Sequence, residues 1–153
     1  MKNKMERLRF MQGEWHVQAS IINEKGQWIE TPIPNETTIF PMLGGVCHRE
    51  EMPVAYDEVI VRLFFSWSYD KHRNIFRMIS CDDQTGLMDV MEGDFLSNSD
   101  TVVIDNTRTS SPSSFRQLAS TKNSENSFTD IVSESYDKGL SWTPVFRAIH
   151  IRK

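Results

Sequence analysis

The segment Glu58–Tyr69, with the sequence EVIVRLFFSWSY, decides the fold. From Val59 onward, every second residue is apolar or aromatic, whereas the residues between them are mixed. Successive side chains of a β-strand point to opposite faces, so this alternation predicts a strand with one face in the core. The predicted inner face carries Phe65, Trp67 and Tyr69 at its C-terminal end.

Similar segments recur along the whole chain at roughly ten-residue spacing, and turn residues bound each of them. Strands are predicted at Glu14–Ile22, Trp28–Thr31, Glu36–Phe40, Val46–Met52, Glu58–Tyr69, Ile75–Asp82, Met88–Phe95, Thr101–Thr107, Phe115–Lys122, Ser127–Tyr136 and Trp142–Arg152. A short helix is predicted at Lys4–Met11, ahead of Gly13. A meander of this length has to close, because an open sheet would expose two unpaired edges. The sequence therefore predicts an all-β fold, a closed antiparallel barrel of about ten strands, as a single domain over residues 1–153.

Composition narrows the function classes. The chain has 153 residues and a net charge of -4, with its basic residues scattered, and this argues against nucleic-acid binding. It contains no apolar run of the roughly 18 residues needed to span a membrane and begins with no secretion signal, so a cytoplasmic protein is expected. Cys47 and Cys81 fit neither a disulfide framework nor a metal-ligand spacing, and no metal or cofactor is predicted.

A barrel of ten strands is wider than side chains fill easily, so a ligand cavity is predicted inside it. The residues predicted to line this interior are Trp15, Phe65, Trp67, Tyr69, Phe76, Met78, Met88, Glu92, His150 and Arg152. The last strand leaves two alternatives open. Either Phe146, Ala148, His150 and Arg152 face inward, or Val145, Arg147, Ile149 and Ile151 do.

Gly13-Glu14-Trp15, after a short helix, resembles the Gly-x-Trp opening of lipocalins. In that group an arginine of the closing strand often packs over the tryptophan, a position that Arg152 matches. Further matching motifs are Pro41-Met42-Leu43-Gly44-Gly45, Ser68-Tyr69-Asp70, Cys81-Asp82-Asp83-Gln84-Thr85-Gly86, Glu92-Gly93-Asp94-Phe95, Phe115-Arg116 and Asp137-Lys138-Gly139-Leu140-Ser141-Trp142. Together they resemble the lipocalin-like family called domain of unknown function 1579. This resemblance implies a calycin-type barrel and no established activity; Ser80 and Cys47-His48 depart from the family pattern.

Two polar motifs each have a functional and a structural interpretation. Ser135–Trp142 is similar to the Asp-box of sialidase propellers, which would suggest a glycosidase. A single copy in so short a chain favours a tight hairpin instead. Asp82, Glu92 and Asp94 are predicted to cluster near one end of adjacent strands, either as carboxylates that grip a ligand or as a charged rim. The rim is favoured, because charged residues are rarely buried without a partner.

The leading function is binding of a small hydrophobic molecule, with Arg116, Arg147 or Arg152 as an interior cation for a carboxylate head. One alternative is a haem-binding barrel similar to nitrobindins, with His150 as the ligand. A second is an enzyme that uses Glu92 or His150 as a general base, although no nucleophile triad or phosphate loop supports it. The third is a homodimeric interaction protein with outward-facing Ile60 and Phe64 at its interface.

Overall fold

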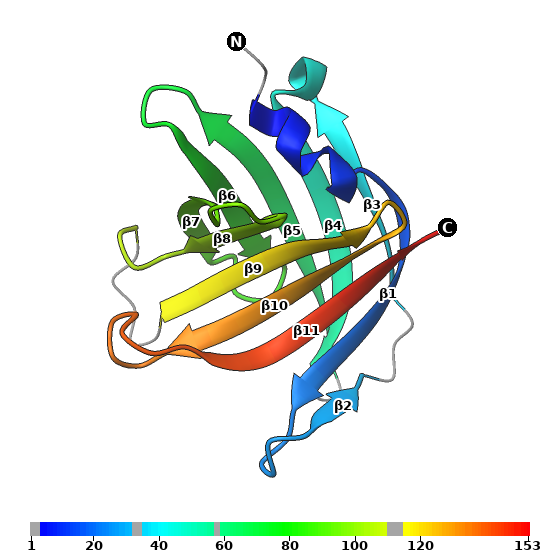
Figure 1. Ribbon diagram of the computed structural model, residues 1–153. Helices are drawn as coiled ribbons and strands as arrows, with labels where there is room; N and C mark the ends of the chain where they lie inside the picture. The colour runs from blue at the N-terminus through cyan, green and yellow to red at the C-terminus, as the bar shows by residue number, and fades with distance from the viewer. Residues whose placement is uncertain (1–3, 32–34, 57–58, 110–114) are drawn as a thin grey trace.

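A computed structural model describes residues 4–31, 35–56, 59–109 and 115–153 (Figure 1). The described residues form strands β1 (Gly13–Ile22), β2 (Trp28–Glu30), β3 (Asn35–Met42), β4 (Cys47–Tyr56), β5 (Val59–Asp70), β6 (Ile75–Asp82), β7 (Met88–Phe95), β8 (Thr101–Asp105), β9 (Phe115–Ser124), β10 (Ser127–Ser135) and β11 (Thr143–Arg152). The predicted N-terminal helix, η1 (Lys4–Met11), is a 3-10 helix, and a second short one, η2, spans Leu43–Gly45. The predicted all-β fold is confirmed.

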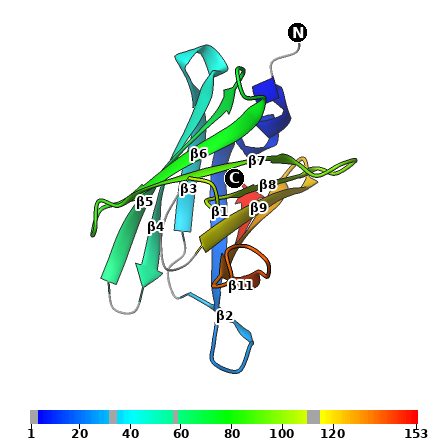
Figure 2. The ribbon, with the colours of Figure 1, turned by 90° about the vertical axis from the view of Figure 1, so that its left-hand side faces the viewer.

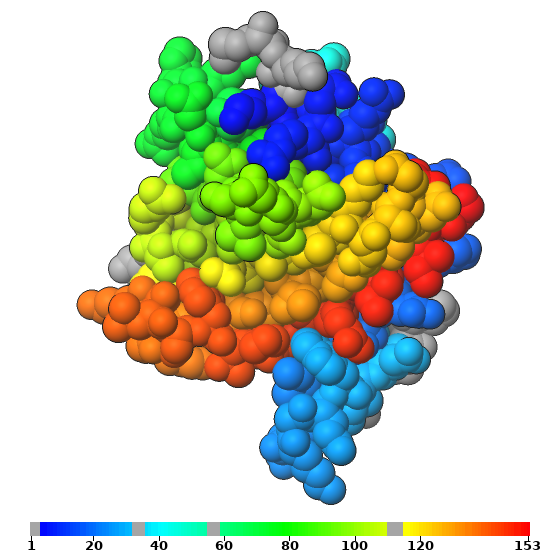
Figure 3. All heavy atoms as spheres, viewed as in Figure 1, coloured from blue at the N-terminus to red at the C-terminus, as the bar shows by residue number. Residues whose placement is uncertain are grey.

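One antiparallel sheet closes into a barrel. Its strand order is β11-β10-β9-β8-β7-β6-β5-β4-β3-β1-β2, with an additional pairing of β11 to β1. This pairing runs from Trp15 opposite Arg152 to Ile21 opposite Phe146. The short strand β2 pairs only with the C-terminal part of β1, so it lies outside the ring of ten and projects from the barrel (Figures 1 and 3). Closure thus occurs as the sequence predicts, with β2 as an appendage.

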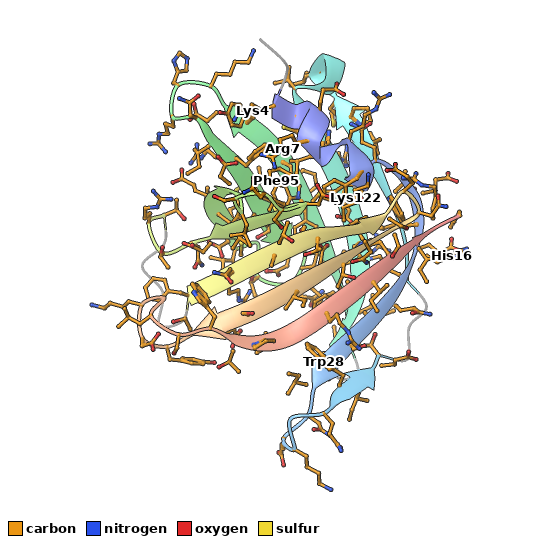
Figure 4. The ribbon with its side chains drawn as sticks, in the orientation of Figure 1. Lys4, Arg7, His16, Trp28, Phe95 and Lys122 are labelled. Carbon is orange, nitrogen blue, oxygen red and sulfur yellow. The ribbon has the colours of Figure 1, made fainter. Side chains whose placement is uncertain are left out.

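Helix η1 lies over one end of the barrel (Figures 1 and 2). Met5, Leu8 and Met11 of this helix are buried in the hydrophobic core. On its outward side, the Arg7 guanidinium carbon lies 3.6 Å from the centre of the Phe95 ring (Figure 4). We call this end, which the helix covers, the closed end. None of the helices in the described part of the chain is long and apolar enough to cross a membrane.

The seam between the first and last strands reaches the closed end at Trp15 and Arg152. The Arg152 guanidinium stacks 4.2 Å from the centre of the Trp15 ring and donates a hydrogen bond of 3.1 Å to the Gln12 carbonyl oxygen. Trp15 Nε1 donates to the Met11 carbonyl oxygen at 2.8 Å. Gly13 has φ +134°, and a Cβ there would collide with the Arg152 guanidinium, so the position requires glycine. The Gly-x-Trp motif and Arg152 thus form one structural unit.

The ambiguity in the last strand is settled by burial. Ala148 and His150 are 1% and 0% exposed, and His150 lies opposite the buried Val17 of β1. The set Phe146, Ala148, His150 and Arg152 therefore faces inward. Other residues predicted to face inward also do so: Trp15, Phe65, Trp67, Tyr69, Phe76 and Met78 all lie on the inner face.

Two interior predictions on β7 are wrong. Met88 is 64% exposed, and Glu92 lies opposite Arg77 on the outer face of the sheet. The inner face of β7 carries Met91 and Gly93 instead, opposite the buried Met78 and Phe76. The prediction failed because β7 has apolar residues on both faces, Met88 and Val90 on the outer one and Met91 and Phe95 on the inner one.

Gly93 is required by close packing rather than by its backbone conformation. A Cβ at this position would overlap the carbonyl oxygen of Val103 on the neighbouring strand, which cannot move without disrupting the ladder. We expect Gly93→Ala to lower the free energy of unfolding by about 3 kcal/mol, because overpacking a rigid site forces backbone shifts. Urea unfolding measures the loss.

Gly86 provides the control for this prediction. It has φ +66° and open space around it, so Gly86→Ala should cost only about 1 kcal/mol, through backbone strain. Equal losses in the two variants would show that the contact with Val103 does not constrain the barrel.

Candidate functional site

The interior of the barrel has two halves of different character. At the closed end, Trp15, Phe76, Met78 and Phe128 are at most 1% exposed. At the opposite end Met52 and Val54 are buried, but seven other inward-facing side chains keep intermediate exposure. These residues are Val61, Leu63, Phe65, Ser80, Asp89, Val132 and Phe146, and we call them the mouth. Since these side chains point into the barrel, their exposure means that solvent reaches its inner surface at this end.

A polar cluster lies deeper in the barrel, where β4, β10 and β11 face one another. His150 Nε2 lies 3.9 Å from Glu50 Oε1, and His150 Nδ1 lies 4.0 Å from Asp130 Oδ2. The imidazole stacks on Phe128 with 3.9 Å between ring centres and an angle of 9°. Both nitrogen–oxygen distances are too long for hydrogen bonds, and neither ring nitrogen has a hydrogen-bond partner among the described residues. We call Glu50, Asp130 and His150 the interior cluster.

Burial sets the protonation of the interior cluster. It raises the pKa of Glu50 to about 8, an effect that the Asp130 charge strengthens and the hydroxyl of Thr37, 2.9 Å from Glu50 Oε1, opposes. Burial likewise raises the pKa of Asp130 to about 7, against the hydroxyl of Ser120. It lowers the pKa of His150 to about 3. Near pH 7 the cluster therefore contains a neutral imidazole and at least one protonated carboxyl group, and it carries little charge.

The interior cluster was missed from the sequence. The feature of the sequence that could have revealed it is a charged residue among the apolar residues of a strand's inner face. On β4, Glu50 shares the inner face with Met52 and Val54, and on β10 Asp130 shares it with Phe128. The general rule that charged residues face solvent hid both positions. His150 is the one member that the sequence predicted.

The predicted cluster of Asp82, Glu92 and Asp94 does not exist. Asp82 accepts hydrogen bonds from the backbone N–H groups of Gln84 and Thr85 in the turn between β6 and β7. Glu92 lies at the far end of β7 on the outer face, and Asp94 is exposed. The strands β6 and β7 are antiparallel, so the turn that holds Asp82 lies at the opposite end from Glu92.

None of the three arginines predicted to bind a carboxylate ligand lies beside the interior cluster. Arg152 stacks on Trp15 at the closed end. Arg147 is on the outward-facing set of β11, with its guanidinium carbon 4.7 Å from the centre of the Trp28 ring. Arg116 lies at the edge of the barrel, 3.6 Å from a carboxylate oxygen of Glu134. The prediction that one of these arginines supplies an interior cation for a ligand's carboxylate was therefore wrong.

The Asp-box segment is a tight hairpin, as its structural interpretation predicted. Asp137 Oδ1 accepts hydrogen bonds from the Ser141 backbone N–H at 2.9 Å and from the Ser135 hydroxyl at 2.7 Å. These and the Ser141 hydroxyl lower the pKa of Asp137 to about 2. Gly139 has φ +83° and its Cα faces the Trp142 ring. The carboxylate thus organises a turn between β10 and β11.

Metal binding finds no support in the geometry. Within the described ranges, no three His, Cys, Asp or Glu side chains are grouped closely enough to hold a metal ion. In the interior cluster the two carboxyl groups face different nitrogens of His150, so one ion cannot bind all three residues.

Comparison with known proteins adds no functional assignment: no protein-family model and no curated protein matches this chain. The site therefore has to be interpreted from its own chemistry.

The interior cluster makes stability depend on pH. The pKa values of Glu50 and Asp130 are raised in the folded protein, so the native state binds more protons than the unfolded chain. The lowered pKa values of His48 and His150 act in the opposite sense below a pH of about 6.5, so the free energy of unfolding should fall mainly as pH rises from about 6.5 to about 8. Glu50→Gln removes an ionisation from this set. As pH rises from about 5 to about 9, the free energy of unfolding of this variant should increase by roughly 2 kcal/mol relative to that of the wild type, because only the wild type has to ionise Glu50. Urea unfolding at each pH measures the difference.

A matched control is Glu24→Gln, at an exposed turn position. Its stability should follow that of the wild type across the same pH range. If Glu50→Gln also followed the wild type, Glu50 would not titrate as an uncompensated buried acid.

Proposed function

We propose that the barrel binds a small, largely apolar molecule in the half that opens at the mouth. One observation carries the proposal: the seven inward-facing side chains of the mouth are partly exposed, whereas Trp15, Phe76, Met78 and Phe128 at the closed end are at most 1% exposed. Leu63, Phe65, Val132 and Phe146 offer the ligand an apolar wall. The ligand's polar group would meet Asp130, whose side chain is 19% exposed and is the most accessible member of the interior cluster.

The charges of the inner surface favour a ligand without a carboxylate. Glu50, Asp89 and Asp130 all lie on the inner face toward this half. Among the described residues, no lysine or arginine forms an ion pair with any of them, and Arg116, at the edge of the barrel, is already paired with Glu134. A carboxylate would therefore enter a region of acidic groups with no free partner, at a large desolvation cost. A neutral ligand with a hydrogen-bonding group avoids this cost, because protonated Glu50 and Asp130 can donate and neutral His150 can accept.

The expected affinity is moderate. Burial of about 300 Å² of apolar ligand surface stabilises a complex by roughly 7–8 kcal/mol at about 25 cal/mol per Å². Association and ordering consume several kcal/mol of this gain. A dissociation constant in the micromolar range follows.

Haem binding and catalysis are less well supported by the geometry. Each ring nitrogen of His150 already faces a carboxyl oxygen, so an iron bound to either nitrogen would have to displace Glu50 or Asp130. The lowered pKa of His150 also makes it a weak base near neutral pH. Glu92, the other predicted base, lies outside the barrel.

Three further proposals rest on the sequence. Membership of the lipocalin-like family, domain of unknown function 1579, rests on the motifs quoted above, and a cytoplasmic location rests on composition. A homodimer would use the outer face of β5, where Ile60 is 56% exposed. Sedimentation at several concentrations tests the dimer, and a monomer at all of them would contradict it.

Neutral and anionic dyes test the proposed ligand chemistry. We expect Nile red, which is neutral, to bind with increased fluorescence, and the fatty-acid probe cis-parinaric acid to bind at least about tenfold more weakly. Leu63→Trp should weaken Nile red binding about tenfold, because the larger ring fills the mouth.

The matched control is Ile60→Trp, which adds the same ring on the outer face of the same strand and should leave binding unchanged. Absence of Nile red binding, or equal binding by both variants, would contradict a ligand site in the barrel. Native mass spectrometry of freshly purified protein should also reveal any co-purified neutral molecule.

A further inference from the structure

A second concave site lies outside the barrel, on the face formed by β6, β7 and the turn after β8. Figure 2 views the molecule from this side. A hollow of about 560 Å³ is lined by three arginines, Arg73, Arg77 and Arg108, together with Glu92. Ile75 and Val90 add apolar surface. The volume is in the range of small-molecule sites.

Glu92 holds two of these arginines in place. It is 7% exposed although it lies on the outer face, because guanidinium groups cover it. Its Oε1 atom lies 2.8 Å from Arg73 Nη1 and 2.9 Å from Arg77 Nε. A single carboxylate oxygen thus anchors both side chains. Each guanidinium has five N–H donors, so most of their donor groups remain for another partner.

The third arginine comes from a different element. Arg108 is exposed in the turn that follows β8, and the hydroxyl of the next residue, Thr109, donates a hydrogen bond to the Val90 carbonyl oxygen. This bond holds the turn against β7. Within the part of the chain that the structure describes, no hydrogen bond or ion pair involves the Arg108 side chain. The backbone of Arg108 is thus held beside the hollow, and its guanidinium has no ion pair among the described residues.

The charges of the hollow are opposite in sign to the charge of the protein. Three arginines and one glutamate give its lining a formal charge of +2, whereas the whole chain has a net charge of -4. Asp70 Oδ2 lies 3.9 Å from Arg73 Nε and offsets part of its charge, while Asp70 Oδ1 accepts from the backbone N–H groups of His72 and Arg73, so Arg77 and Arg108 contribute most of the excess. The excess positive charge is therefore local and is formed by planar guanidiniums, which match the oxygens of phosphate.

We propose that this hollow binds the phosphate group of a small phosphorylated molecule, with the organic part against Ile75 and Val90. A phosphate monoester carries close to two negative charges near neutral pH, which matches the lining. The hollow also has room beyond the phosphate itself. The site is separate from the interior of the barrel, so it does not depend on the function proposed there.

Calorimetric titration with phenyl phosphate at low ionic strength tests the proposal. We expect phenyl phosphate to bind more tightly than inorganic phosphate, and phenol not to bind in the hollow. Arg108→Gln should weaken phenyl phosphate binding about tenfold, since a charge-assisted hydrogen bond is lost. Arg73→Gln should also weaken it. Added salt should weaken binding in the wild type.

Arg62→Gln, on the exposed outer face of β5 and away from the hollow, makes the same charge change and should leave binding unchanged. Since the Arg108 side chain makes no hydrogen bond or ion pair among the described residues, its variant should fold normally, as far-UV circular dichroism will show, and should bind Nile red like the wild type. If inorganic phosphate binds as tightly as phenyl phosphate, the oxyanion site stands and free phosphate is its ligand. No binding of either phosphate, or equal binding by Arg108→Gln, Arg62→Gln and the wild type, overturns the proposal.

Discussion

The pairing of β1 with β11 is the constraint on which the rest of the structure depends. Seven residue pairs, from Trp15 opposite Arg152 to Ile21 opposite Phe146, convert an open sheet into a ring and remove two exposed edges. They also fix the register of β11, which turns His150 inward. The stack of Arg152 on Trp15 lies at the end of this seam, and Gly13 leaves room for it. Without this register, the interior cluster would not assemble.

Helix η1 then gives the barrel two unequal ends. It covers the end where β1 begins and β11 finishes, and there aromatic rings fill the interior in edge-to-face contacts, such as Trp15 with Phe128 at 5.0 Å. The opposite end has no such cover among the described residues, and its inner side chains stay partly exposed. Glu50, Asp130 and His150 lie between these halves. A ligand entering from the mouth would therefore pass apolar walls before it reached polar groups.

The strands could be predicted from the sequence within a few residues, because turn residues separate them and β5 alternates so clearly. The faces of β7 could not, since MDVMEGDF has apolar residues on both of them, and the inner face includes Gly93, where the nearby Val103 backbone leaves no room for a side chain. The interior cluster could not be predicted either. Its members lie far apart in the chain and meet only through the ring. Their burial contradicts the ordinary preference of carboxylates for water, and only the folded register reveals it.

The two proposed sites share one ladder of the sheet. Strand side chains alternate, so Met78 and Met91 face the interior while their neighbours Arg77 and Glu92 form the wall of the outer hollow. Beside these two sites the faces differ in charge: Glu50 and Asp130 lie inside, where burial favours their protonated forms, and Arg108 lies outside with no ion pair among the described residues. An anion is disfavoured within the barrel by the same arrangement that attracts it to the outer surface. The two sites therefore select molecules of different charge.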